Sequence, residues 1–456
     1  MKREKTPSVS LFTLGCKVNQ YETQSISEHF ADAGYSVVNE GLPADVFVIN
    51  TCSVTNIADR KSRQMIRRAR KLNPDAVIAV TGCYVQTAAE DVIGMEDVDI
   101  AAGNNEKSRL VEYVTQFLKK REQAEGAAGK DSRKGPAESH ILSFGELTEY
   151  EDLGCITAME SRSRAFIKIQ DGCDRFCSYC IIPYARGRVR SRQEESILQE
   201  ASALLDAGYR ELVLTGINTA LYGADTEGRT DIAGLIQRME SLGGDFRIRL
   251  SSLEPNVIDV GVAERLLERE KLCHHMHLAI QSGCDTVLKR MYRRYTVDDY
   301  RKIVEALRRG DPEYGITTDI ITGFPGETEE EFRTTLETVK EIGFSKVHVF
   351  RYSLRGGTVA ASRKDQIDGK EKSRRAGILS EEAERAQVAF FRKNMGQVRR
   401  VLFETLDAQT GLMEGYTDNY IKVHVPADGL KEVPAEFTEV RLTGLSPDGM
   451  RGEIPE

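Results

Sequence analysis

Three cysteines lie close together in one short segment of the chain, Cys173-x-x-x-Cys177-x-x-Cys180. Iron–sulfur clusters are normally held by four cysteine thiolates. A segment that offers three can hold three irons of a [4Fe-4S] cluster, and the fourth iron then stays open to a small chelating ligand such as S-adenosylmethionine (SAM). A structural zinc site of the Cys3His type is the alternative. The local sequence disfavours it, because no histidine occurs between His140 and His274.

Three further cysteines each follow a short apolar stretch that is typical of a buried strand. They are Cys16 after residues 9–15, Cys52 after residues 45–51 and Cys83 after residues 77–82. Parallel strands present their carboxyl ends at one edge of a sheet, where α/β folds bind ligands. We therefore predict that these three thiols converge on a second [4Fe-4S] cluster. The alternative, that each is a small buried hydrophobic side chain, does not explain why all three share this position.

The elements that must position these cysteines follow an α/β pattern. Residues 8–120 alternate short apolar strands with polar helical stretches, which predicts a parallel sheet covered by helices. Beyond Arg164 a strand-then-helix unit recurs, which predicts a partial (βα)6 barrel whose active site lies on the loops that follow the strands. The six candidate strands are residues 165–170, 211–216, 247–252, 275–280, 316–322 and 346–352.

The remaining segments complete a four-part organisation. Residues 121–160 are polar and charged, as linkers are, and residues 390–456 predict a small antiparallel β-barrel. We thus expect an amino-terminal α/β domain at 1–120 that carries the second cluster, a linker at 121–160, the partial barrel at 161–389 and the β-barrel at 390–456. The chain has no run of about 18 apolar residues, so we expect no membrane association and a cytoplasmic location.

The net charge of −8 means that any contact with nucleic acid must depend on local patches. Residues 60–71 carry seven positive side chains and no acid, and residues 186–192 carry four. Such runs are usually solvated helix faces, but both lie near predicted cluster cysteines and are therefore candidates for phosphate contact. In the β-barrel, Tyr416 and Tyr420 are candidates for stacking on RNA bases.

The order of these parts resembles the radical-SAM methylthiotransferase family, and the last part resembles the TRAM domain of tRNA-modifying enzymes. The motifs that carry the resemblance are Thr13-Leu-Gly-Cys16-Lys-Val-Asn-Gln, Asn50-Thr-Cys52-Ser-Val-Thr55, Thr81-Gly-Cys83 and Asp319-Ile-Ile-Thr-Gly-Phe-Pro-Gly326. Around Cys16 and Cys52 the chain is similar to the branch that acts on N6-threonylcarbamoyladenosine in tRNA.

The resemblance implies an enzyme that adds a methylthio group to carbon 2 of that adenosine, next to the anticodon. A radical derived from SAM would remove the hydrogen, and sulfur from the second [4Fe-4S] cluster would be inserted with a methyl group. The implied partners are the anticodon stem-loop of tRNA, an electron donor such as a flavodoxin or ferredoxin, and a sulfur source.

The resemblance also implies a SAM pocket, in which the aromatic residue before the last cysteine, here Tyr179, lies against the adenine. Polar residues and glycines at other strand ends fall on the same predicted rim of the barrel. The candidates are Gly216, Asn218, Ser252, Glu254, Gln281 and Asp319. No side chain is predicted to act as a catalytic acid or base.

Three alternative functions stay open at this point. The same chemistry could act on isopentenyladenosine in tRNA, or on an aspartate of a ribosomal protein. A protein of a different class, which binds RNA through an iron–sulfur or zinc site without turnover, is the third.

Overall fold

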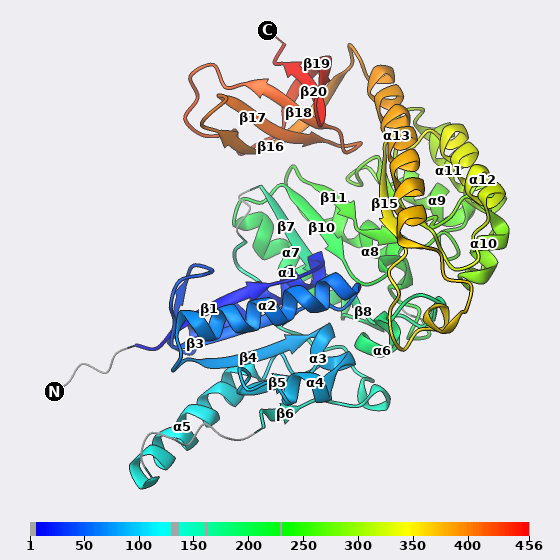
Figure 1. Cartoon of the computed structure of the whole chain (residues 1–456). Helices are drawn as coiled ribbons and strands as arrows, with labels where there is room; N and C mark the ends of the chain where they lie inside the picture. Colours follow the sequence, from blue (N-terminus) through cyan, green and yellow to red (C-terminus); the bar gives the residue numbers. More distant parts are fainter. Residues whose placement is uncertain (1–5, 129–135, 160–162, 229, 456) are drawn as a thin grey trace. The chain divides into compact units, whose positions relative to one another are not determined.

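The computed structural model describes residues 6–128, 136–159, 163–228 and 230–455 (Figure 1). The chain divides into two compact units. Unit 1 comprises residues 1–156, 170–192 and 353–358, and unit 2 comprises residues 157–169, 193–352 and 359–456. The cysteine segment 173–180 therefore belongs to the same unit as Cys16, Cys52 and Cys83. The division of the chain at residues 120, 160 and 389 stays a prediction.

Unit 1 is built on a six-stranded parallel sheet with strand order β2-β1-β3-β4-β5-β6. The strands are β1 (Ser8–Thr13), β2 (Ser36–Val38), β3 (Val46–Thr51), β4 (Val77–Gly82), β5 (Ile100–Ala102) and β6 (Glu138–His140). The helices are α1 (Lys17–Asp32), α2 (Asn56–Leu72), α3 (Cys83–Thr87), α4 (Ala89–Ile93) and α5 (Leu110–Ala128). The predicted parallel α/β architecture of this region is confirmed.

Helices cover both faces of this sheet because its central strands are apolar on both sides. Phe47 of β3 joins the hydrophobic cluster that contains Ile66 of α2, whereas its neighbour Val48 joins the cluster that contains Ile26 of α1 and Leu110 of α5. Successive side chains of a strand point to opposite faces. A strand that is buried on both sides therefore reads as a continuous apolar run, as residues 46–49 do.

The segment with the three clustered cysteines is a compact loop of unit 1. Strands β8 (Gln170–Asp171) and β9 (Arg190–Ser191) pair antiparallel, and helix α6 (Ile182–Arg186) lies between them in sequence. Gly172 adopts a φ of +72°, and a Cβ atom at this position would lie 1.8 Å from the carbonyl oxygen of Arg188. Only glycine fits this close approach, so the turn that leads into Cys173 depends on it.

Unit 2 contains the predicted partial barrel as two adjoining parallel sheets. The first has the order β11-β10-β7 and the second β12-β13-β14-β15. The strands are β7 (Arg164–Lys168), β10 (Glu211–Thr215), β11 (Arg247–Leu250), β12 (Ser252–Leu253), β13 (His275–Leu278), β14 (Gly315–Thr322) and β15 (Lys346–Arg351). The fold class is as predicted, except that the expected strand 247–252 is divided into β11 and β12.

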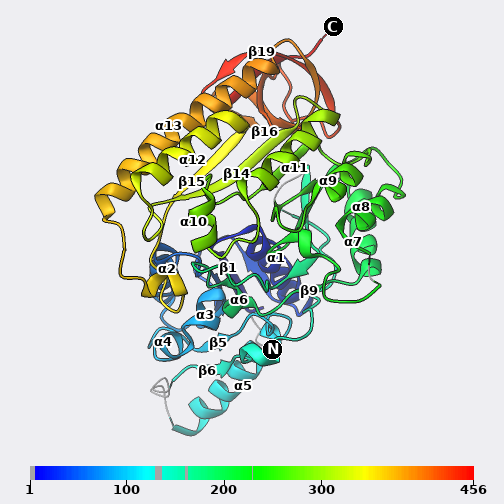
Figure 2. The same ribbon diagram turned by 90° about the vertical axis from the view of Figure 1, so that its right-hand side faces the viewer.

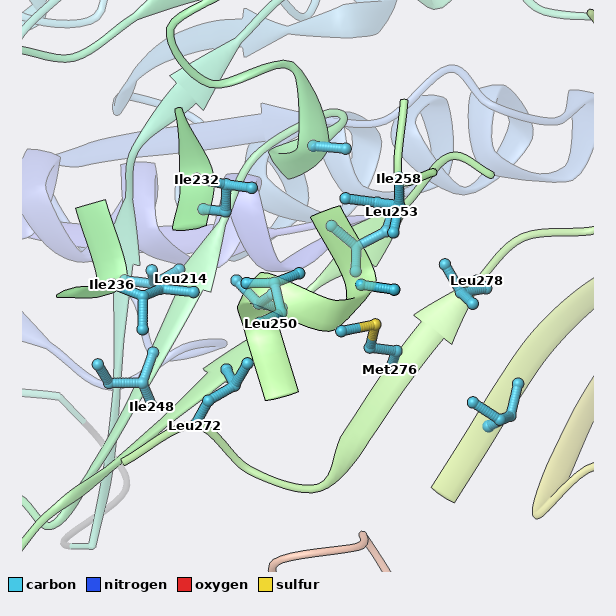
Figure 3. Packing of buried hydrophobic residues seen from close by; sticks show 14 of the residues in the cluster. Leu214, Ile232, Ile236, Ile248, Leu250, Leu253, Ile258, Leu272, Met276 and Leu278 are labelled. Atoms are coloured by element: carbon cyan, nitrogen blue, oxygen red, sulfur yellow. The ribbon is translucent and has the colours of Figure 1, made fainter. Parts of the chain in front are cut away.

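Helices cover the outer face of these sheets. They are α7 (Glu194–Asp206), α8 (Ile232–Glu240), α9 (Val260–Leu267), α10 (Asp285–Arg290), α11 (Val297–Gly310), α12 (Glu329–Ile342) and α13 (Gly369–Lys393). Leu214, Ile236, Ile248 and Met276 belong to one large apolar cluster between strands and helices (Figure 3). Figure 2 shows α12 and α13 side by side next to β15. Among the helices of the described residues, none is long and apolar enough to cross a membrane.

The last part of unit 2 is a closed five-stranded barrel with the order β16-β17-β18-β20-β19. Its strands are β16 (Val398–Asp407), β17 (Leu412–Thr417), β18 (Lys422–Pro426), β19 (Thr438–Ser446) and β20 (Gly449–Glu453). Four of the strand pairs are antiparallel, as predicted, but the pair β18–β20 that closes the barrel is parallel. Closure leaves no unpaired sheet edge.

A buried ionic network links this small barrel to the amino ends of the large-barrel strands. Glu211, the first residue of β10, is 1% exposed and accepts hydrogen bonds from Arg247 Nε at 2.6 Å and Arg249 Nε at 2.8 Å. The same two arginines donate to the carbonyl oxygens of Tyr416 and Thr417, at 2.9 and 3.1 Å. This end of a parallel barrel is the one concerned with stability rather than catalysis.

The arginines of this network also pack on Tyr416 and Tyr420, the two tyrosines that were candidates for RNA contact. The Tyr416 and Tyr420 rings stack on each other with centroids 4.9 Å apart. The guanidinium of Arg164 lies over Tyr416 at 5.5 Å, and that of Arg249 lies over Tyr420 at 4.5 Å. The prediction that these rings stack on RNA bases is therefore wrong, because their faces already pack against each other and against arginines of the strand ends.

We expect Glu211→Gln to lower the free energy of unfolding of unit 2 by about 3–5 kcal/mol, because it leaves Arg247 and Arg249 buried beside a neutral group. Burial would raise the pKa of the Glu211 carboxyl, but Arg249 and Arg247 outweigh it and hold the pKa well below its ordinary value of 4.5. The stabilisation should therefore be complete above about pH 4.5 and be lost as the pH falls through the lowered pKa.

Denaturant unfolding at pH 7 and at pH 3 would measure this effect. The control is Asp245→Asn, which breaks the exposed ion pair with Arg400 and should cost at most about 1 kcal/mol. Equal losses for the two variants would contradict the structural role given to Glu211.

Candidate functional site

The strand order of unit 1 brings three of the predicted cluster cysteines to one place. Cys16 follows β1 and precedes α1, Cys52 follows β3 directly, and Cys83 follows β4 as the first residue of α3. The strands β1, β3 and β4 are neighbours, and the order of the sheet reverses between β1 and β3. Open α/β sheets bind ligands at such a reversal, beyond the carboxyl ends of the strands. All three thiols lie at this switch point.

Local backbone geometry shows how closely the chain segments approach one another here. Gly15 has a φ of +106°, and a Cβ atom on it would lie 2.7 Å from Cβ and 2.8 Å from Sγ of Cys52. The glycine therefore allows the turn before Cys16 to pass directly over Cys52. Cys52 and Cys83 are 7% and 3% exposed, whereas Cys16 is exposed to solvent.

The chemistry of the thiols fits a metal cluster. Burial is the largest of the effects that together raise the pKa of Cys52 to about 11. The neighbouring Cys83 and Cys16 act in the same direction, while a hydrogen bond with the Val54 backbone and the charge of Arg186 oppose them. Without a cation this thiol stays protonated at neutral pH, and a bound metal would deprotonate it. Three thiols at one edge of the sheet are a suitable donor set for a group that carries positive iron.

The buried Arg186 contacts this cysteine site. Arg186 is 0% exposed, and its Nε donates to Cys83 Sγ at 3.3 Å. Its two terminal nitrogens donate to Glu22 at 2.8 Å, to Asp171 at 3.0 Å and to the side-chain oxygen of Asn19 at 2.7 Å. Sequence reasoning missed the roles of Asn19, Glu22 and Asp171. Their positions, three and six residues after Cys16 and two before Cys173, are the signal that could have found them.

The prediction that residues 186–192 contact RNA phosphates is wrong for most of the run. Arg186, Arg190 and Arg192 are 0%, 2% and 0% exposed. Arg190 donates to the side chain of Asn105 at 2.7 Å, and Arg192 donates to the Tyr21 hydroxyl at 3.1 Å. Arg188, by contrast, is exposed on the turn that leads from α6 into β9. A count of charges in the sequence does not show which arginines of the run are buried.

The other cysteine set is held in the compact loop between β8 and β9. Cys173, Cys177, Tyr179 and Cys180 are all half-buried. The Cys173 amide donates to the carbonyl of Gly187 at 3.0 Å, and the Cys180 amide donates to the carbonyl of Cys177 at 2.9 Å. Because Asp171 and Arg186 flank this loop and bond to each other, its two ends are fixed together. Three thiols on one constrained loop suit a cluster with one open iron.

The predicted SAM-pocket residues of unit 2 fall into two groups. The Asn218 amide donates to Glu254 at 3.0 Å, and the hydroxyl of Thr219 donates to the carbonyl of Ser252 at 3.1 Å. Gly216 follows β10 in the same region. The predicted residues Gly216, Asn218, Ser252 and Glu254 therefore lie on two neighbouring segments, one after β10 and one that contains β12. Glu254 also forms an ion pair of 2.9 Å with Arg293.

The second group contains Gln281 and Asp319. Gln281 adopts a left-handed φ of +65°, and its amide donates to the carbonyl of Asp319 at 2.9 Å. The carboxylate of Asp319, however, lies 3.3 Å from Nε2 of His277. The Asp319 carboxylate therefore contacts a histidine that was not among the residues predicted from the sequence.

The basic run at residues 60–71 forms most of α2. Two of its cations are used inside unit 1: Arg63 donates to the Tyr84 hydroxyl at 3.0 Å, and Arg70 pairs with Asp99 at 2.8 Å. The other five are exposed, and none of them forms an ion pair with another described residue: Arg60, Lys61, Arg67, Arg68 and Lys71. The exposed face of α2 thus carries positive charge that the fold itself does not neutralise.

Two family models match the chain. Residues 8–103 match the model described as uncharacterized protein family UPF0004, and residues 167–339 match the radical SAM superfamily. The first match covers β1 to β5 of the sheet with Cys16, Cys52 and Cys83. The second covers the loop with Cys173, Cys177 and Cys180 together with most of the partial barrel.

Several named proteins are similar over most of their length. The threonylcarbamoyladenosine tRNA methylthiotransferase MtaB of Bacillus subtilis (strain 168) is 42% identical over 91% of this chain and 90% of its own. MtaB of Thermotoga maritima is 34% identical over 97% of this chain and 96% of its own length. A tRNA-2-methylthio-N(6)-dimethylallyladenosine synthase of Carboxydothermus hydrogenoformans is 34% identical over 87% of this chain and 88% of its own length.

Among solved structures, the radical SAM methyltransferase TsrM of Kitasatospora setae, with tryptophan and a SAM analogue bound, aligns with a TM-score of 0.59. The alignment covers 78% of this chain and 75% of that one at 16% identity, which shows a shared fold. The identities of the named relatives decide the family. The chain belongs to the radical-SAM tRNA methylthiotransferases.

Proposed function

We propose that this protein adds a methylthio group to carbon 2 of N6-threonylcarbamoyladenosine in tRNA. The observation that carries the proposal is the convergence of Cys16, Cys52 and Cys83 at the switch point of the sheet, in the same compact unit as the Cys173 loop. The relatives named threonylcarbamoyladenosine tRNA methylthiotransferase include one at 42% identity, whereas the dimethylallyladenosine synthase described above is 34% identical. The threonylcarbamoyl substrate is therefore favoured over the isopentenyl one.

Two [4Fe-4S] clusters and SAM are the cofactors of this function. Cys173, Cys177 and Cys180 would hold one cluster, and Cys16, Cys52 and Cys83 the other. When bound, these groups supply the radical and the sulfur that an unactivated ring carbon requires. Candidate SAM contacts are Tyr179, Gly216, Asn218, Ser252, Glu254, Gln281 and Asp319. The carboxylates of Glu254 and Asp319 also contact Arg293 and His277.

The protein's own side chains set the environment of this chemistry. Arg186 brings a fixed positive charge and an N–H donor to Cys83, and its bonds to Glu22 and Asp171 hold it there. Such hydrogen bonds to ligand sulfur tune the potential of an iron–sulfur centre. Arg186 is thus a positioning residue, which acts on the reaction through Cys83.

The remaining partners follow from the reaction. A reductive radical step needs an electron donor such as a flavodoxin or ferredoxin, and repeated turnover needs a source of sulfur. A tRNA substrate also implies that the enzyme works in the cytoplasm. The exposed face of α2 is our candidate for contact with the phosphates of the tRNA, since five cations there have no acidic partner among the described residues.

The function predicts a specific change in tRNA. We expect a strain that lacks the gene to lose the 2-methylthio derivative of N6-threonylcarbamoyladenosine, as measured by mass spectrometry of tRNA nucleosides. The wild-type gene should restore it, and Cys52→Ala should not, because the second sulfur-bearing site then lacks a ligand. The control is Cys155→Ala, outside both cysteine sets, which should restore it fully.

Two results would contradict this assignment. Loss of the isopentenyladenosine derivative alone would favour the other tRNA substrate. Unchanged tRNA nucleosides, with loss of a methylthio group from a ribosomal protein, would favour the protein substrate.

The contact of Arg186 with Cys83 predicts a shift in reduction potential. In a variant with Cys173, Cys177 and Cys180 all replaced by Ala, the remaining site should hold about four irons. Adding Arg186→Gln should move the midpoint potential of that cluster to a more negative value, because one N–H donor and one positive charge are lost. Potentiometric titration followed by electron paramagnetic resonance measures this.

Two further variants make the result specific. Arg186→Lys keeps the charge, so it should shift the potential less than Arg186→Gln. Arg188→Gln removes an exposed neighbour and should leave the potential unchanged. A purely structural role for Arg186 would change the iron content but not the potential of the clusters that still form.

The charge on α2 predicts salt-dependent tRNA binding. Arg67→Glu together with Arg68→Glu should weaken tRNA binding at least tenfold and lower the slope of log affinity against log salt by roughly 2. Filter binding at several salt concentrations measures both quantities. The control, Lys302→Glu with Arg309→Glu, changes the net charge equally on α11, where the cations already face Asp298 and Glu264. Equal losses in both variants would mean that net charge, rather than α2, binds the tRNA.

A further inference from the structure

Three side chains of unit 2 that could bind a metal ion meet on one face of the large-barrel sheet, and none of them is a cysteine. His277 is on β13, Asp319 on β14 and His348 on β15, and these three strands are neighbours in parallel. In the register of the sheet, His277 lies opposite Thr317 and His348 lies opposite Asp319. Thr317 and Asp319 are two residues apart, so they point to the same face. All three candidate ligands therefore project from that face.

This face is the one that does not pack on the helices. The intervening residues Met276, Leu278, Ile316 and Ile320 belong to the apolar cluster under α11 and α12. His277 and Asp319 are half-buried, and His348 is exposed. A small ion could therefore reach the three side chains, which are nonetheless held in place by the ladder of the sheet.

The distances suit coordination of one ion. One ligand atom from each of the three side chains lies within 4.8 Å of the others. His277 Nε2 is 3.3 Å from Asp319 Oδ2. Bonds of about 2.0–2.2 Å to an ion place neighbouring ligand atoms about 3.3–3.6 Å apart in a tetrahedral site. The first pair already has this spacing, and His348 is exposed, so a side-chain rotation can bring its ring nitrogen into range.

A further contact orients His277 as a metal ligand would be oriented. Its Nδ1 lies 2.9 Å from the hydroxyl of Thr317, which leaves Nε2 directed at Asp319. Histidines that bind metals usually have their other ring nitrogen hydrogen-bonded in this way, since the contact fixes both the tautomer and the ring. Thr317 is 3% exposed and on the same strand as Asp319, so the orienting group belongs to the same rigid element.

We propose that His277, Asp319 and His348 bind one divalent first-row transition-metal ion, with zinc as the probe. Two imidazoles and one carboxylate are a donor set for such ions, and they differ from the thiolates that select iron–sulfur clusters. Three protein ligands leave at least one coordination position for water or for an oxygen of a bound molecule. The site gives Asp319 the role of metal ligand in place of the SAM contact expected from the sequence. It does not depend on the tRNA function.

The test uses the full-length chain with its cysteine sites first reconstituted with iron and sulfide, so that zinc cannot occupy them. After passage over a chelating resin, the protein is titrated with zinc, and bound zinc is measured by mass spectrometry after gel filtration. We expect about one zinc per chain in addition to the iron. His348→Ala and Asp319→Asn should each weaken zinc binding at least tenfold.

The matched control is His274→Ala. His274 and Asp311 form another histidine–carboxylate pair in unit 2, with Nδ1 and Oδ2 2.7 Å apart, but no third ligand joins them within the described part of the chain. This variant should bind zinc like the wild type. Because His348 is exposed, its replacement should leave the iron content and the circular dichroism spectrum unchanged, which separates loss of a ligand from loss of the fold.

Two outcomes would overturn the proposal. The first is a wild-type protein that retains no zinc beyond the cysteine sites, which would leave a plain ion pair between His277 and Asp319. The second is zinc bound equally by the wild type and by both ligand variants, which would place the ion elsewhere.

Discussion

The buried guanidinium of Arg186 is the interaction on which the arrangement of the cysteine sites depends. An isolated charge in a protein interior is very costly unless it is paired and hydrogen-bonded. Arg186 meets Glu22 and Asp171, and Lys107 adds a second cation 3.3 Å from Glu22. These buried cations and carboxylates therefore pair inside unit 1, where the buried Arg190 also lies 4.0 Å from Asp171. Removing any one of them would leave an unpaired buried charge, which is far more destabilising than losing a surface pair.

This pairing of charges also determines geometry. Glu22 is on α1, which begins directly after Cys16, and Asp171 ends the strand before the Cys173 loop. The buried charges can neutralise one another only if these segments lie together, so the requirement for pairing holds both cysteine sets within one compact unit. Buried ion pairs often add little net stability. Their effect here is better described as specifying which segments meet, and Cys83 receives its hydrogen bond as part of the same arrangement.

Most of the fold could be predicted from the sequence because the apolar runs and the strand-end cysteines are local signals. Residues 46–49 read as a doubly buried strand without any knowledge of their neighbours, and the cysteine that follows is then at the edge of the sheet. Pairings between distant segments could not be predicted in this way. Asp319 is recognisable in the sequence as a candidate, but nothing there connects it with His277 until the register of β13 and β14 places the two together. The parallel closure of β18 on β20 likewise depends on barrel geometry and leaves no mark in either strand.

Charge was the least reliable local signal, and the two arginine-rich runs explain why. A run of cations is expected to be solvated, yet residues 186–192 are largely buried because acids, carbonyls and a sulfur of unit 1 surround them. Most of the cations in residues 60–71 are solvated, since Ile66 and Ala69 bury one side of α2 and leave five of the seven cations exposed. Cations on one helix face repel each other and gain nothing from the fold. Their presence is better explained by an anionic partner outside the chain, and the phosphate backbone of tRNA has that chemistry.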